Sequence, residues 1–259
     1  MPATLKSHSV DATLVLTISN PDHRNALGPE MYAAGVEAFN AADGNPDVRS
    51  IVITGEGPHF CAGGNLQRLL GNRQHPPAVQ AESIEGLHGW IEAVRSASKP
   101  VVAAVEGSCA GAGFSLALAC DFLVAARDSV FVMAYANVAL SPDGGGSWNL
   151  ARQLPRATTM QLLMLGERFG ADRLQQLGLI NHVTEPGQAL HRALELCESL
   201  NAKAPNALAS IKELVNDAAQ QPLSAHLRQE RDQFVRNLHH PNGGEGISAF
   251  LDKRPARYR

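Results

Sequence analysis

The fold is decided by two glycine-bearing stretches, Phe60-Cys61-Ala62-Gly63-Gly64-Asn65-Leu66 and Cys109-Ala110-Gly111-Ala112-Gly113-Phe114-Ser115-Leu116. Each stretch follows an apolar, strand-like run and leads into a helix-like one. A glycine-rich turn between a strand and a helix leaves backbone N–H groups without partners inside the helix. Two such turns lying side by side can direct their N–H groups at one oxygen atom. The pattern therefore favours a site that stabilises a carbonyl oxygen as it gains negative charge.

On both sides of these turns, apolar β-branched runs alternate with helix-like stretches. The expected strands are 13–18, 49–54, 100–105, 121–125, 129–133 and 180–183, and the expected helices are 29–40, 82–96, 114–119, 147–153, 158–166 and 171–177. This alternation predicts an α/β fold with largely parallel sheets. From Pro186 onward the pattern is nearly all helical, with candidate helices at 188–201, 206–219 and 224–237.

The composition indicates a globular protein that binds a small or medium-sized ligand. The chain has 259 residues, 44% of them hydrophobic, which is enough to bury a full core. The formal net charge is −3, from 22 basic and 25 acidic residues, and no long run of one sign occurs. This balance argues against binding to nucleic acid or to an anionic membrane surface.

Cysteines and histidines form no metal-binding pattern. The four cysteines are Cys61, Cys109, Cys120 and Cys197, and none has paired ligand spacing. The adjacent His239 and His240 cannot place both rings on one helix face. We therefore expect no metal, reduced thiols and a cytoplasmic location. The N-terminus lacks the apolar core of a signal peptide, and Glu106 and Asp121 interrupt the longest apolar stretch, so we expect no membrane span.

Further motifs follow one another along the whole chain. They are Pro21-Asp22-His23-Arg24-Asn25-Ala26-Leu27, the 60–66 turn, Lys99-Pro100-Val101-Val102-Ala103-Ala104-Val105 before the 111–113 turn, Ala119-Cys120-Asp121, Pro142-Asp143-Gly144-Gly145, Gly178-Leu179-Ile180-Asn181 and the tail 245–254. In this order the chain resembles, end to end, the crotonase superfamily, which is the enoyl-CoA hydratase and isomerase family. A dinucleotide-binding turn fits poorly, because Leu116 stands where G-x-G-x-x-G requires its third glycine.

The resemblance implies a particular architecture and substrate. Residues 1–195 would form a spiral of ββα turns that holds the acyl-CoA site, and residues 196–259 a helical region that assembles chains into a trimer or a dimer of trimers. The substrate would be an acyl-CoA thioester, so that coenzyme A enters with the substrate and no separate cofactor is expected. Matching the motifs places the two backbone donors to the thioester oxygen at Gly64 and Ala112.

The resemblance also implies where coenzyme A binds. The residues beside it would be Arg24, Ala26, Leu27, Ala62, Asn65 and Leu66, with Phe250 and Lys253 reaching the coenzyme A of a neighbouring subunit. Arg24 and Lys253 suit phosphate groups, because a cation meeting a phosphate forms charge-assisted hydrogen bonds. Ordinary solvated surface charges would explain both residues equally well.

The residues expected to carry out the reaction indicate isomerisation. Hydratases of this family use two glutamates to handle water, and the matching positions here hold Ser115 and Tyr135, neither of which serves as a carboxylate base. Asp143 matches the working acid of several family isomerases. One carboxylate beside a stabilised enolate can remove a proton and return it elsewhere. We therefore expect Asp143 to be the acid and base of an enoyl-CoA isomerase, with Ser115, Tyr135 and His88 shaping the acyl pocket.

Alternatives remain open at this point. Asp143 is also a natural turn residue that would cap the helix starting near Ser147. The spacing of His88 resembles that of the histidine in aryl-CoA dehalogenases, which also use an aspartate. The chain departs from those enzymes at Tyr135, where they carry a tryptophan. The simpler interpretation is that His88 is a polar residue at the rim of the pocket or on the surface. A hydratase, a thioester hydrolase and a non-catalytic coenzyme A-binding relative are the remaining possibilities.

Overall fold

The computed structural model describes residues 3–259 and contains a six-stranded sheet in the order β1-β2-β3-β4-β6-β9. These strands are Thr4–Val10, Thr13–Ser19, Ser50–Gly55, Val101–Val105, Phe122–Ala126 and His182–Thr184. β1 pairs antiparallel with β2, and every later pair in this sheet is parallel. A smaller sheet joins β5 (Ser108–Ala110), β7 (Val130–Val132) and β8 (Arg168–Gly170). The expected α/β class with largely parallel sheets is confirmed.

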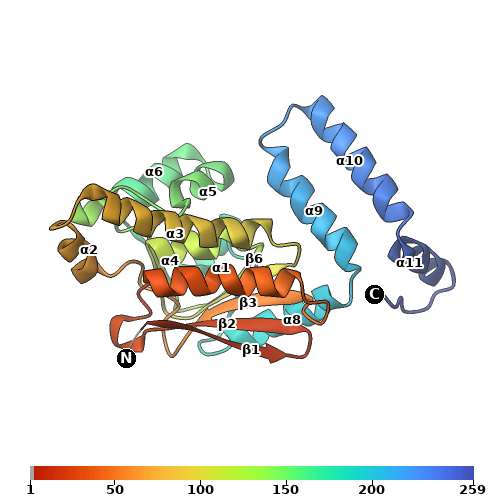
Figure 1. Cartoon of the computed structure of the whole chain (residues 1–259), viewed down its shortest axis with the longest axis horizontal. Helices are drawn as coiled ribbons and strands as arrows, with labels where there is room; N and C mark the ends of the chain where they lie inside the picture. The colour runs from red at the N-terminus through yellow and green to blue at the C-terminus, as the bar shows by residue number, and fades with distance from the viewer. Residues whose placement is uncertain (1–2) are drawn as a thin grey trace.

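Helices cover both faces of the large sheet (Figure 1). They are α1 Pro29–Asp43, α2 Leu66–Asn72, α3 Pro77–Ser96, α4 Ala112–Ala119, α5 Gly146–Gln153, α6 Arg156–Met164, α7 Ala171–Gln176, α8 Ala189–Asn201, α9 Pro205–Ala218, α10 Leu223–Leu238 and α11 Pro241–Leu251, with short 3-10 turns at Pro21–His23 and Ala136–Val138. The helix expected from Glu82 begins earlier, at Pro77. A proline is tolerated in the first turn of a helix, because its missing N–H would have no partner there.

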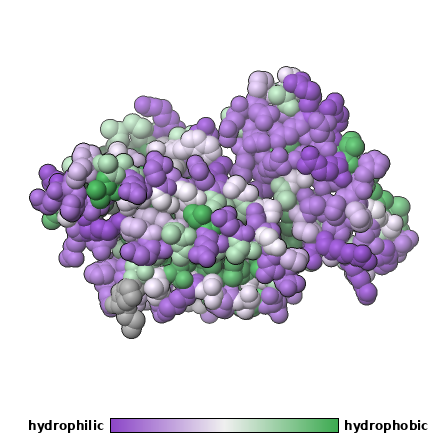
Figure 2. Space-filling view, viewed as in Figure 1, coloured by the Kyte–Doolittle hydropathy of each residue, from purple (hydrophilic) through white to green (hydrophobic). Residues whose placement is uncertain are grey.

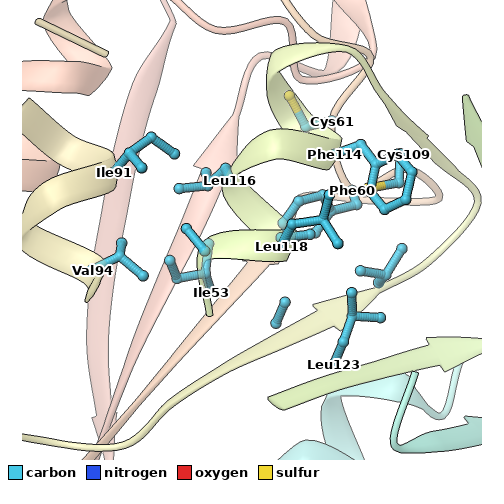
Figure 3. Close-up of a cluster of buried hydrophobic side chains, with 14 of the residues drawn as sticks. Ile53, Phe60, Cys61, Ile91, Val94, Cys109, Phe114, Leu116, Leu118 and Leu123 are labelled. Atoms are coloured by element: carbon cyan, nitrogen blue, oxygen red, sulfur yellow. The ribbon is translucent and has the colours of Figure 1, made fainter. Parts of the chain in front are cut away.

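Alternate residues along each strand divide the core into two layers. On one face, Ile53 and Ala103 pack with buried side chains of α1, α3 and α4. On the other face, Val52 and Val102 pack against α8. Figure 3 shows the first layer, where residues of α3 and α4 meet those of the two glycine-bearing stretches. The residues that border both turns are therefore anchored in the core.

The last three helices, α9, α10 and α11, extend away from the sheet (Figure 1). Large apolar side chains remain exposed on them, including Ile211, Val215, Leu223, Phe234 and Phe250. α8 spans position 195 and belongs to the sheet layer, so the segment that stands apart begins with α9. The division of the chain into units at 195 and 196 stays a prediction. No helix within residues 3–259 combines the length and the apolar character needed to cross a bilayer.

Lys212 joins α9 to the body of the molecule. Its Nζ donates to the carbonyl oxygens of Val94 and Lys99 at 2.9 and 3.3 Å and lies 2.9 Å from Asp121 Oδ2. The same carboxylate oxygen accepts the N–H of Val101 at 2.8 Å. The Lys212 and Asp121 side chains are only 10% and 22% exposed. Burial raises the pKa of Asp121, and the nearby Lys212 charge opposes that rise.

Replacing Lys212 with methionine should destabilise the fold by about 2–4 kcal/mol near pH 8, because it leaves a largely buried carboxylate without its cation. An acid with a raised folded-state pKa binds more protons folded than unfolded, so its contribution to stability falls as pH rises. The loss should therefore be smaller near pH 5, where Asp121 can take up a proton. Urea unfolding at both pH values measures this. A loss of the same size at pH 5 and pH 8 would contradict the role given to Asp121.

Candidate active site

The first glycine-bearing turn is fixed between two neighbouring segments. The N–H of Leu27 donates to the Gly63 carbonyl at 2.8 Å, and that of Ala62 to the Arg24 carbonyl at 2.9 Å. On the other side, Cys61 forms a parallel bridge with Cys109. Cys61 Sγ lies 3.3 Å from the Gly63 nitrogen and accepts its N–H. Burial raises the pKa of Cys61 to about 12, so this thiol stays neutral and holds the turn.

The two turns lie in direct contact. Gly63 and Gly111 have φ values of 94° and 50°, in the region that favours glycine. A Cβ atom at position 63 would lie 2.8 Å from the Ala110 carbonyl oxygen and 3.5 Å from the Ala112 nitrogen. A Cβ atom at position 113 would lie 2.6 Å from Cys61 Sγ. Only glycine permits this approach, which brings residues about fifty positions apart into one site.

Two backbone N–H groups at this contact are unused. Among residues 3–259, neither the N–H of Gly64 nor that of Ala112 donates a hydrogen bond. Ala112 is 4% exposed and is the first residue of α4, all of whose residues are buried. The positive end of the helix dipole lies at this N–H and increases its attraction for a negatively charged group. Such groups can receive a ligand oxygen that carries negative charge.

Asp143 lies beside the second turn and is held by two hydroxyl-bearing residues. Tyr135 Oη donates to Asp143 Oδ1 at 2.6 Å. Ser115 Oγ donates to the Asp143 backbone carbonyl at 2.9 Å. A Cβ atom at position 111 would lie 3.7 Å from Tyr135 Oη, so this group borders the turn. Burial, followed by the negative charge of Asp143, raises the pKa of Tyr135, which keeps the phenol protonated as a donor.

The alternative role of Asp143 as a helix cap is wrong. The residue before α5 is Gly145, and α5 has no side-chain cap. The Asp143 carboxylate instead faces Tyr135, while its backbone carbonyl accepts the N–H of Gly146 at 3.2 Å. Positive φ values at Gly144 and Gly145 turn the chain there. The Pro-Asp-Gly-Gly turn thus presents the carboxylate to the site.

His88 stands apart from this group. Its side chain is 41% exposed, and its Nδ1 lies 3.8 Å from Glu85 Oε1 on the same helix. The preceding residue, Leu87, is the one that faces the Asp143 loop, since a Cβ at Gly144 would lie 3.3 Å from Leu87 Cδ2. The structure thus brings Ser115 and Tyr135 to Asp143 and leaves His88 on its own helix.

The residues expected near coenzyme A fall into two groups. Those of the 24–27 and 62–66 segments adjoin the first turn, where Asn65 caps α2 by accepting the N–H groups of Gln67 and Arg68. Leu27 is 1% exposed and bonds to the turn through its backbone N–H, whereas Leu66 is 57% exposed. Phe250 and Lys253 lie at α11, at the opposite end of the molecule from α2 (Figure 1). Neither residue borders the turns of its own chain.

Sequence reasoning did not single out Tyr32 and Arg68. Burial raises the pKa of the Tyr32 hydroxyl, the positive charge of Arg68 opposes this rise, and the negative charge of Asp143 adds to it. The Tyr32 phenol therefore lies within the electrostatic reach of both Arg68 and Asp143. The signal in the sequence was slight: one arginine shortly after the first turn, and one tyrosine on the buried face of a helix.

Within the described part of the chain, from residue 3 onward, no three His, Cys, Asp or Glu side chains gather as ligands. The arrangement instead offers unused backbone donors beside a carboxylate. Such a site can hold a carbonyl oxygen and move a proton near it.

The chain is similar to known proteins along nearly its whole length. The family model described as enoyl-CoA hydratase/isomerase matches residues 9–259. The chain is 32% identical to a 1,2-epoxyphenylacetyl-CoA isomerase of Escherichia coli K12, over 97% of each chain. It is also 32% identical to the enoyl-CoA hydratase EchA19 of Mycobacterium tuberculosis, over 95% of this chain and 93% of that one.

Solved structures show the same fold. A crystal structure titled as an enoyl-CoA hydratase from Polaromonas sp. JS666 superposes with a TM-score of 0.98 at 66% identity, covering 99% of this chain and 100% of that one. An enoyl-CoA hydratase subunit from Geobacillus kaustophilus superposes with a TM-score of 0.91 at 31% identity, covering 98% and 97%. The fold implied by the sequence motifs is confirmed. The chain belongs to the enoyl-CoA hydratase/isomerase family.

Proposed function

We propose that this enzyme shifts the double bond of an enoyl-CoA, with Asp143 as the acid and base and the N–H groups of Gly64 and Ala112 as donors to the thioester oxygen. The observation that carries the proposal is the pairing of Asp143 Oδ1 with Tyr135 Oη, 2.6 Å apart, beside two turns in which the N–H groups of Gly64 and Ala112 have no acceptor among residues 3–259. Coenzyme A arrives as part of the substrate, and the reaction needs no further cofactor.

The reaction conserves every atom of the substrate. Asp143 removes a proton from carbon 2 of a 3-enoyl-CoA, the C–H electron pair forms a double bond between carbons 1 and 2, and the carbonyl electrons move onto the oxygen to give a dienolate. The two backbone N–H groups stabilise the oxygen as it becomes negative, each contributing about 3–4 kcal/mol to lowering the barrier. Asp143 then returns the proton to carbon 4, which yields the conjugated 2-enoyl-CoA.

Hydration is the second candidate, because the relatives EchA19 and the Polaromonas protein are named enoyl-CoA hydratases. Ser115 and Tyr135 occupy the positions where the family hydratases carry glutamates. Ser115 is fully buried and donates to backbone carbonyls, and Tyr135 is held protonated, so neither offers a base for water. This arrangement favours isomerisation.

One experiment separates the two reactions. Purified enzyme is incubated with a 3-enoyl-CoA and, separately, with crotonyl-CoA, and the products are followed by mass spectrometry. We expect conversion of the 3-enoyl-CoA without a change in mass and almost no addition of water to crotonyl-CoA. Rapid hydration of crotonyl-CoA without isomerisation would overturn the proposal, and release of halide or free thiol from an aryl-CoA would indicate a hydrolytic enzyme.

Tyr135→Phe tests how Asp143 is positioned. Removing the hydroxyl leaves the ring in place but frees one carboxylate oxygen to rotate, so kcat should fall about tenfold with little change in KM, the loss expected for about 1.4 kcal/mol. Tyr258→Phe removes the same atom from the C-terminal tail and serves as the control. Steady-state kinetics of both variants with a 3-enoyl-CoA measures the effect. A KM increase with unchanged kcat would instead assign Tyr135 to substrate binding.

The exposed apolar side chains of α9, α10 and α11 support an assembly of three chains or of two stacked trimers. In such an assembly Phe250 and Lys253 of one chain would reach the coenzyme A held by Arg24 and the 62–66 turn of another. Sedimentation analysis should give a mass three or six times that of the 27.6 kDa chain.

The four free thiols favour a reducing, cytoplasmic setting.

A further inference from the structure

A groove of about 750 Å³ runs between α1, α2 and α3. Tyr32 and Val36 line it from α1, Arg68 from α2, and Ser83 from α3. In Figure 2, hydrophobic and near-neutral residues bordered by hydrophilic ones occupy the area where α1 and α3 lie in Figure 1. The volume lies within the range of about 300–1,000 Å³ that small-molecule sites occupy. This is enough room for the acyl group of a thioester.

The groove lies close to the candidate active site, because Gly86 lines it and the next residue, Leu87, faces the Asp143 loop. The Tyr32 ring borders the groove, where a Cβ at Gly86 would lie 3.3 Å from its Cδ2. The charges of Arg68 and Asp143 both act on its hydroxyl group. A chain that extends from a thioester held near Asp143 therefore meets Tyr32 and Arg68 as it enters the groove.

Arg68 has an unused donor at this entrance. Its Nη1 donates to Ser83 Oγ at 2.9 Å, which fixes the guanidinium across α2 and α3. Its Nε is buried and has no hydrogen-bond partner among the described residues. A buried donor without a partner is costly to the fold, and a ligand oxygen that accepts this N–H would remove that cost.

The charges of the groove select the kind of oxygen. Arg68 is accompanied there by two acidic residues, Glu37 and Glu82, and no second cation lines the groove within residues 3–259. Asp143 adds a further negative charge nearby. A carboxylate on the acyl group would meet this acidic surrounding, whereas a keto, hydroxyl or ether oxygen would accept the Arg68 N–H without such repulsion.

Building on the proposed acyl-CoA chemistry, we propose that the groove receives the acyl group and that Arg68 selects acyl groups bearing an uncharged oxygen acceptor beyond the reacting carbons. Arg68 is then a specificity-determining residue of this enzyme. The hydrogen bond to Ser83 holds the guanidinium in place, so its Nε is a fixed donor. A plain hydrocarbon chain offers no acceptor for this N–H.

Calorimetric binding of saturated ligands tests this, because saturated acyl-CoAs bind without being isomerised. The probes are octanoyl-CoA, the octanoyl-CoAs with an oxo group at carbon 5, 6 or 7, and the mono-CoA thioester of octanedioic acid. The wild-type enzyme should bind at least one oxo ligand about tenfold more tightly than octanoyl-CoA. Arg68→Met, which keeps the length of the side chain without its donors, should reduce that preference to less than about threefold.

The controls separate a specific role from a general one. Arg73→Met makes the same change at the exposed end of α2 and should keep the tenfold preference. If Arg68→Met does not fold, Arg68→Gln, which retains polarity but removes the guanidinium, takes its place. Equal binding of oxo and plain ligands by the wild-type enzyme, or a preference unchanged in the variant, would overturn the proposal.

The same measurements distinguish this inference from the proposed function. Tightest binding of the octanedioic ligand would also overturn the inference, because it would show that Arg68 recognises a carboxylate. Selective binding of oxo ligands by an enzyme that fails to convert 3-enoyl-CoAs would support the groove assignment and reject isomerisation. Turnover of 3-enoyl-CoAs without oxo selectivity would do the reverse.

Discussion

Asp143→Asn should lower kcat for 3-enoyl-CoA isomerisation by about 10²- to 10⁴-fold, the range that a positioned acid or base contributes. The amide keeps the size of the side chain, and its oxygen still accepts a hydrogen bond from Tyr135 Oη. It cannot take up the proton from carbon 2. KM should change little, because the substrate contacts of the turns and the groove remain.

Single-turnover and steady-state kinetics, read from the absorbance of the conjugated product, measure this loss. Asp128→Asn is the matched control, since Asp128 is an exposed acid in the turn after β6 and makes the same change in charge. Thermal unfolding of both variants shows whether the fold is intact. Wild-type turnover in Asp143→Asn would remove this residue from the chemistry and leave the reaction without a base.

Ala112→Pro should lower kcat by about 10²- to 10³-fold, which corresponds to loss of one oxyanion donor. Proline is accepted at the first position of a helix, so the change removes the N–H with little damage to α4. The thioester oxygen then has only the Gly64 N–H. The lost hydrogen bond stabilises the transition state, in which the oxygen is negative, more than the bound substrate. The change should therefore lower kcat more than it weakens substrate binding.

Ala112→Gly provides the comparison, because it changes the side chain and retains the N–H. Its activity should stay within a few-fold of the wild type. Circular dichroism and the affinity for saturated acyl-CoA show whether each variant folds and binds. Comparable turnover by Ala112→Pro and Ala112→Gly would show that this N–H has no part in catalysis.

The sequence was most informative where one residue determines local backbone geometry. Gly63 and Gly111 adopt positive φ values at the two turns, and their spacing after apolar strands predicted both turns and the helix α4 after the second. The short helix α2 after the first turn was not among the expected helices. The alternation of apolar strands and helices likewise predicted the parallel sheet. These features depend on the conformational preferences of short sequence segments, which are visible in the sequence itself.

Features that depend on distant partners were harder to predict. β1 is a largely exposed edge strand that is held in the sheet by its pairing with β2. It was missed because its own residues do not alternate between apolar and polar. The Tyr135 to Asp143 hydrogen bond and the cluster of Tyr32 with Arg68 arise from packing between separate elements. Residue type and spacing suggested Asp143 as a base, but only the fold shows that it is not a helix cap.

The central claim is that the backbone N–H groups of Gly64 and Ala112 bind one thioester oxygen. A crystal structure of the enzyme with a saturated acyl-CoA thioester tests this most directly. We expect the thioester oxygen to lie about 2.7–3.1 Å from both nitrogens. A thioester oxygen that faces solvent, or that contacts other groups while either nitrogen lies beyond hydrogen-bond distance, would contradict the account.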